Sequence, residues 1–103
     1  MNIEIINEGE RVTAVLSGDI DHHALQTARL SIDTVIESAC PDELVLDFKN
    51  VNFMDSSGIG LILGRRRKLP GGKVYVINAN RHIKRILLLA GLDKSIREPV
   101  GNV

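Results

Sequence analysis

The chain alternates between segments with the period of a β-strand and segments with the period of an α-helix. Residues 2–7 and 11–17 are rich in β-branched residues and flank Gly9, which together indicate a hairpin. The following segments are expected to be helix, strand, helix, strand and helix, at residues 21–40, 43–48, 56–69, 73–78 and 80–90. Strands that alternate with helices in this way predict a mostly parallel sheet with right-handed crossovers.

The ends of the expected helices carry recognisable signals. The first helix has an apolar face made of Leu25, Ala28, Ile32, Val35, Ile36 and Ala39. Asp21 is expected to cap its start and Pro41 to end it, while Asn80 caps the last helix and Gly91 follows its end. A short edge strand is expected within residues 94–100. The predicted fold class is therefore α/β, with a small mixed sheet of four or five strands and helices.

Length and composition narrow the class of protein. The 103 residues predict a single domain over residues 1–103, and a hydrophobic share of 44% is enough for a core. Thirteen basic and thirteen acidic side chains balance, which argues against direct nucleic-acid binding through bulk charge. The one cysteine, Cys40, fits a reducing compartment and is expected to be a partly buried, unreactive small residue. Without a membrane-length apolar run or a signal peptide pattern, we expect a cytoplasmic location and no membrane contact.

The segment FMDSSGIG, residues 53–60, joins the expected central strand to the second helix. In parallel sheets, sites collect where strands end and helices begin, and GDID at residues 18–21 lies near another such end. One serine is explained as a helix cap. The glycines are not explained, because Gly58, Gly60 and Gly64 each disfavour the helix by about 1 kcal/mol relative to alanine. They either pack closely on the sheet or leave a bare surface for a partner.

An exposed serine at a helix N-terminus also suits a charge switch, since a phosphate there meets free N–H groups and the helix dipole.

The sequence gives less support to an enzyme active site or a metal site. Neither serine has the glycine two residues before it that a nucleophile elbow needs, and there is no phosphate-binding P-loop. His22 and His23 are adjacent, so on a helix they point about 100° apart. We expect no catalytic residue, no metal and no cofactor. The basic run at residues 65–68 is interpreted first as a solvated helix face and second as a partner surface.

Three segments carry a resemblance to a known family. GDIDHH, VLDFKNVNFMDSSGIGLILGRRRKL and GGKVYVINANRHIKRILLLAGLDK resemble the anti-sigma-factor antagonists, the single-domain members of the STAS group, and in particular the sporulation-type antagonists of spore-forming bacteria. The resemblance implies a small sheet with helices and a partner that is both an anti-sigma factor and a serine kinase using ATP. In the family motif the acceptor is the serine directly after the aspartate, which corresponds to Ser56. Asp21 and Asp55 match acidic positions near it, and Ser57 would be the neighbouring cap.

The function implied by this resemblance is a partner switch. The unphosphorylated protein would bind the anti-sigma kinase and so release the sigma factor, phosphorylation at Ser56 would end that binding, and a serine phosphatase would reset it. We expect the partner to approach closely over Gly58. The alternatives are a STAS subunit that docks on a transporter without a phosphorylation cycle, and an enzyme with Ser56 or Ser57 as nucleophile, for which no histidine base is suitably spaced. Two departures from the family are Ala24, where many relatives have threonine, and a short C-terminal segment where relatives often have another helix.

Overall fold

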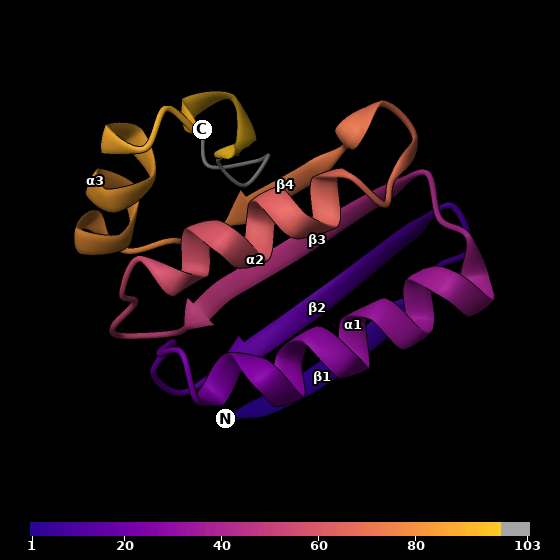
Figure 1. Cartoon of the computed structure of the whole chain (residues 1–103), viewed down its shortest axis with the longest axis horizontal. Helices are drawn as coiled ribbons and strands as arrows, with labels where there is room; N and C mark the ends of the chain where they lie inside the picture. Colours follow the sequence, from indigo (N-terminus) through magenta and orange to yellow (C-terminus); the bar gives the residue numbers. More distant parts are fainter. Residues whose placement is uncertain (98–103) are drawn as a thin grey trace.

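The computed structural model describes residues 1–97, which form a four-stranded sheet in the order β1-β2-β3-β4 (Figure 1). The strands are β1 (Asn2–Asn7), β2 (Arg11–Ser17), β3 (Glu43–Asn50) and β4 (Val74–Ile77). β1 runs antiparallel to β2, whereas β2, β3 and β4 are parallel to one another. The predicted hairpin and the predicted mixed, mostly parallel sheet are both confirmed.

Three α-helices connect and follow the parallel strands. They are α1 (Ala24–Ala39), α2 (Ser57–Arg66) and α3 (Arg81–Leu89), with short 3₁₀ turns η1 (Pro70–Gly72) and η2 (Asp93–Ser95). Figure 1 shows α1 and α2 on the same face of the sheet and α3 on its β4 side. α2 ends three residues before the predicted boundary. Leu69 is already extended, at φ −106° and ψ 143°, because a residue before proline avoids the helical region.

The core lies between the sheet and the helices. Alternate strand residues that point toward the helices are buried: Val12, Ala14, Leu16, Leu44, Leu46, Phe48, Val74 and Val76. The helices contribute a second set: Leu25, Ala28, Ile32, Ile36, Leu61, Ile62, Ile83 and Leu87. The predicted apolar face of α1 is thus the buried face, with Val35 and Ala39 half-buried at its margin. Burial on this scale is the main favourable term that holds the helices on the sheet.

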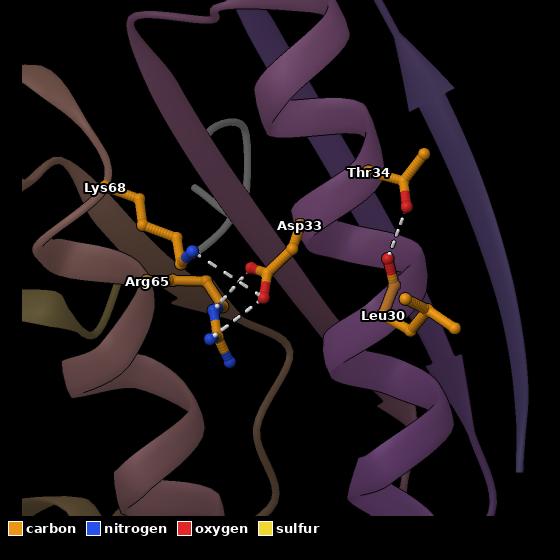
Figure 2. A network of polar contacts seen from close by, with 5 residues as sticks. All are labelled: Leu30, Asp33, Thr34, Arg65 and Lys68. Atoms are coloured by element: carbon orange, nitrogen blue, oxygen red, sulfur yellow. Dashed lines mark hydrogen bonds and ion pairs between the residues drawn. The ribbon is translucent and has the colours of Figure 1, made fainter.

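A partly buried ion pair joins α1 to α2 (Figure 2). Arg65 is only 7% exposed, its Nε lies 3.0 Å from Oδ1 of Asp33, and its Nη2 donates to Oδ2 of Asp33 at 3.3 Å. Lys68 Nζ lies 3.9 Å from the same Oδ2. The interpretation of residues 65–68 as a solvated face is therefore wrong for Arg65. This residue follows Leu61 and Ile62 by four and three positions, so it falls on the buried side of α2.

One further sequence prediction is wrong, and another is tested only in part. Cys40 is exposed, because the chain leaves α1 there in the left-handed region at φ 46°. The expected edge strand within residues 94–100 is a single parallel bridge between Ile96 and Val76 in the described part, and residues 98–100 lie outside it. Arg97 is held beside that bridge, since its N–H donates to the Val76 carbonyl at 2.9 Å and its guanidinium lies 3.5 Å from the centre of the Tyr75 ring. Within residues 1–97, no helix has the length and apolar character needed to cross a membrane.

Candidate functional site

The loops that leave β2 and β3 lie side by side at one end of the sheet. Because these strands are parallel, their carboxyl ends meet at the same edge. Ile20 forms a bridge with Met54, its N–H donates to the Phe53 carbonyl at 2.8 Å, and its carbonyl accepts from the N–H of Asp55 at 2.9 Å. The GDID and MDSSG segments predicted to lie at strand ends are therefore bound directly to each other.

Asp55 caps the N-terminus of α2. Its Oδ1 accepts from the backbone N–H of Ser57 at 2.8 Å and also from the Ser57 hydroxyl, and its carbonyl accepts from the N–H of Gly58 at 3.1 Å. Ser56 already has helical angles, φ −63° and ψ −15°, and its side chain makes no capping bond. The prediction that Ser57 is the cap is thus wrong, because Ser57 donates its hydroxyl instead of accepting an N–H bond.

The carboxylate of Asp55 is stabilised in its ionised form. The hydroxyl of Ser57 and then its backbone N–H lower the pKa of Asp55, burial opposes them less strongly, and the backbone and charge of His22 lower the pKa by still smaller amounts. A carboxylate with a lowered pKa is a good hydrogen-bond acceptor at neutral pH and a weak base. Asp55 therefore serves as a cap and as a fixed negative charge beside the two serines.

The two serines occupy different environments. Ser56 is exposed at the start of α2, and within residues 1–97 its hydroxyl has no hydrogen-bond partner. Ser57 is half-buried and its hydroxyl is engaged by Asp55. The Ser56 hydroxyl is therefore open to an incoming group, whereas the Ser57 hydroxyl would first have to leave Asp55.

Asp21 lies in the neighbouring segment and caps α1. Its Oδ1 accepts from the N–H of Ala24 at 2.8 Å, and its carbonyl accepts from the N–H of Leu25 at 3.1 Å, which confirms the predicted capping contact. Asp19 and Asp21 are both exposed. Since their segment is hydrogen-bonded to that of Asp55, a negative group added at Ser56 enters a region that already carries several carboxylates.

The glycines of α2 have two distinct roles. Gly58 is buried, and a Cβ at this position would lie 2.3 Å from Sδ and 2.5 Å from Cγ of Met54, which is itself fully buried. The expectation that Gly58 leaves room for a partner is therefore wrong, because the chain's own Met54 takes that space. Gly60 is exposed, and a Cβ there would meet only Arg29 Nη2 at 3.9 Å, while a Cβ at Gly64 would meet nothing within 4 Å. These two glycines leave bare backbone on α2.

Contacts from Asn80 and from the first turn of α3 hold the loop before the serines, and the sequence patterns did not reveal them. Phe53 is 45% exposed and stacks on His82 with 6.1 Å between ring centres. The side-chain amide of Asn80 donates to the carbonyls of Val51 at 3.4 Å and Asn52 at 3.1 Å, while its oxygen caps α3 at the N–H of Ile83 as predicted. No group of three or more metal-ligating side chains is present within residues 1–97.

A buried carboxylate in β3 positions the next loop. Asp47 is nearly inaccessible and accepts hydrogen bonds at 3.0 Å both from the amide of Asn78 and from the N–H of Lys49. Asn78 has a left-handed backbone, at φ 59°. An aspartate inside the apolar run ELVLDF was the available signal for this contact, since a buried charge needs partners.

Comparison with known proteins agrees with the fold. Residues 3–102 match the family model of the STAS domain. The anti-sigma F factor antagonist of Paenibacillus polymyxa is 39% identical over 98 residues, which cover 91% of this chain and 84% of the relative. The structure of the anti-sigma factor antagonist SpoIIAA in its unphosphorylated form superposes with a TM-score of 0.86 at 29% identity, covering 97% of this chain and 90% of that one. The structure of the Bacillus cell fate determinant SpoIIAA in its phosphorylated form superposes with a TM-score of 0.76 at 29% identity. The superposition covers 97% of this chain and 93% of that one.

Proposed function

This chain belongs to the STAS family, among the anti-sigma factor antagonists, and from that premise we propose that it is an anti-anti-sigma factor controlled by phosphorylation of Ser56. The unphosphorylated form binds an anti-sigma factor that is also a serine kinase and so releases the sigma factor. The phosphorylated form does not bind, and a serine phosphatase restores the first state. The chain is then a substrate and a ligand, not a catalyst.

The observation that carries this proposal is the free, exposed hydroxyl of Ser56 next to an aspartate that already caps the helix. In the transfer, the Ser56 oxygen attacks the γ-phosphorus of ATP, the bond to the bridging oxygen breaks, and ADP leaves. A base of the kinase takes the hydroxyl proton. Because Asp55 supplies the capping bonds, Ser56 can react without first losing a hydrogen bond of its own.

The charge of the product explains why binding would stop. A phosphoserine carries about −1.5 to −2 charges at pH 7. Here it would lie beside Asp55 and near the segment that holds Asp19 and Asp21, so a partner surface that fits the unphosphorylated site meets added repulsion and desolvation. A loss of about 3 kcal/mol would weaken binding by roughly a hundredfold.

The partner is proposed to contact the exposed side of α2 that begins with Ser56. Gly60 lies one turn further along and has no side chain to hold a partner backbone away. Leu63, which is 39% exposed, and Phe53 border the same region and offer apolar contact area. This surface replaces the contact over Gly58 that the sequence suggested.

The test is phosphorylation in a defined mixture. The chain is incubated with ATP and the anti-sigma F factor of Paenibacillus polymyxa, and intact mass is measured. We expect the unsubstituted chain and Ser57→Ala to gain one phosphate, and Ser56→Ala to gain none. Phosphate on Ser56→Ala but not on Ser57→Ala would move the acceptor to Ser57, and no phosphate on the unsubstituted chain would favour a STAS subunit without a phosphorylation cycle.

A further inference from the structure

We propose that Asp55 selects which of the two adjacent serines accepts the phosphate, by engaging the Ser57 hydroxyl and the first free N–H of α2 and leaving the Ser56 hydroxyl unbound. This inference rests on the proposed function and concerns the choice of acceptor at that site. Ser56 and Ser57 have the same chemistry, so a preference between them has to come from their surroundings.

The first part of the selection is that the Ser57 hydroxyl is already held by a hydrogen bond. Its hydroxyl hydrogen is directed at Oδ1 of Asp55, and the residue is half-buried in the first turn of α2. Since Ser57 itself lowers the pKa of Asp55, the carboxylate is a weak base and holds the Ser57 proton without removing it. Phosphorylation of Ser57 would have to break this hydrogen bond and leave the Asp55 oxygen without its hydroxyl donor.

The second part of the selection is that the Ser56 hydroxyl makes no capping bond. A helix start leaves N–H groups that need acceptors, and serine next to them usually provides its own oxygen. Asp55 Oδ1 already accepts from the N–H of Ser57 at 2.8 Å, and the Asp55 carbonyl accepts from Gly58. Without the Asp55 carboxylate, the helix start loses its side-chain acceptor, so the Ser56 hydroxyl can take the capping role usual for a serine at an N-cap, while the Ser57 hydroxyl becomes free. Both changes shift reactivity from Ser56 to Ser57.

Two substitutions at one position separate hydrogen bonding from charge. Asp55→Ala removes the acceptor, whereas Asp55→Asn keeps an oxygen that accepts the same two bonds and removes the negative charge. Each variant and the unsubstituted chain are incubated with ATP and the Paenibacillus polymyxa anti-sigma F factor. Fragment mass spectrometry then gives the ratio of phosphate on Ser57 to phosphate on Ser56.

We expect phosphate almost entirely on Ser56 in the unsubstituted chain and in Asp55→Asn. In Asp55→Ala the share on Ser57 should rise by at least about tenfold, the change in ratio that loss of one hydrogen bond supports. The amide NMR signal of Ser57 gives a readout that needs no kinase. It should shift as Asp55 is protonated in acid, and this titration should be absent from Asp55→Ala and Asp55→Asn.

Phosphate confined to Ser56 in a folded Asp55→Ala would overturn the inference. So would an equal redistribution in Asp55→Asn and Asp55→Ala, since the charge and not the hydrogen bonds would then select the serine. A Ser57 amide that does not respond to acid would also contradict it. Absence of phosphate from the unsubstituted chain would overturn the proposed function, and this inference with it.

Discussion

Asp55 binds Ser57 through both the backbone N–H, at 2.8 Å, and the side-chain hydroxyl, and it thereby caps α2 from the residue before the serine pair. A serine at the N-cap position normally accepts a hydrogen bond from a backbone N–H, so its hydroxyl oxygen is engaged. Here the cap is moved one residue upstream, so Ser56 remains exposed and unbonded at a helix N-terminus. A capping contact thus leaves the serine that we propose as the phosphoacceptor accessible.

The lowered pKa of Asp55 predicts a dependence of stability on pH. A carboxyl group whose pKa is lower in the folded than in the unfolded state stabilises the fold fully above its unfolded value, about 3.9 for aspartate, and this contribution is lost as pH falls through the folded value. We expect the free energy of unfolding to fall more steeply below about pH 4 in the unsubstituted chain than in Asp55→Asn. Urea unfolding at several acid pH values measures this, and parallel curves for the two proteins would contradict it.

Gly58→Ala should destabilise the fold although Gly58 lies in a helix. The added methyl group would overlap the buried side chain of Met54, and fitting extra volume into a packed core typically costs about 1–3 kcal/mol. Gly64→Ala, six positions further along the helix with open space at its Cβ, is the matched control and should gain up to about 1 kcal/mol. Urea unfolding of both variants gives the comparison. Equal stabilisation of the two would show that Met54 does not occupy the space above Gly58.

Gly60→Ala should separate stability from binding. Helix propensity and ordinary contact with Arg29 predict a gain of up to about 1 kcal/mol in the free energy of unfolding. If the partner lies against this turn, the same methyl group should weaken binding to the anti-sigma factor. A calorimetric titration beside a thermal melt measures both effects, with Gly64→Ala as reference. Unchanged affinity with raised stability would remove Gly60 from the partner surface.

The Asp33–Arg65 pair should be strongly coupled. Asp33→Ala leaves the buried guanidinium of Arg65 without its counter-ion, for which we expect a loss of about 3 kcal/mol in unfolding free energy. Lys68→Ala removes an exposed cation 3.9 Å from the same carboxylate and should cost under about 1 kcal/mol. The double variant Asp33→Ala/Arg65→Met should be more stable than Asp33→Ala alone. The coupling would be contradicted if the losses in unfolding free energy of Asp33→Ala and Arg65→Met added up to the loss of the double variant.

The fold could be predicted because its signals are local. The apolar period of residues 25–39, the hairpin around Gly9 and the strand at residues 43–48 each depend on neighbours in the sequence, and their order sets the sheet. Within residues 94–97, the described part of the expected edge strand, only one bridge forms, between Ile96 and Val76. Pairing at a sheet edge depends on tertiary contacts that composition does not encode.

The site was predicted less completely, since its details depend on what packs beneath it. The motif placed Asp55, Ser56 and the neighbouring GDID segment correctly at strand ends, but it did not show that Asp55 takes the cap from the serines. Gly58 was expected to lie on an open surface, because nothing in the sequence indicates that the side chain of Met54, four residues before it, packs against this position. Asn80 caps α3 through a contact with a near neighbour in the sequence, which the sequence pattern predicts. It also supports the loop through a contact with Asn52, which the sequence pattern does not predict.

The central claim is that phosphorylation of Ser56 ends binding to the anti-sigma factor. The most direct measurement is the affinity of the unphosphorylated chain and of the same chain carrying phosphate on Ser56 for the Paenibacillus polymyxa anti-sigma F factor, titrated under one salt condition. We expect the phosphorylated form to bind roughly a hundredfold more weakly, as about 3 kcal/mol of repulsion and desolvation would produce. Equal affinity of the two forms would contradict the switch.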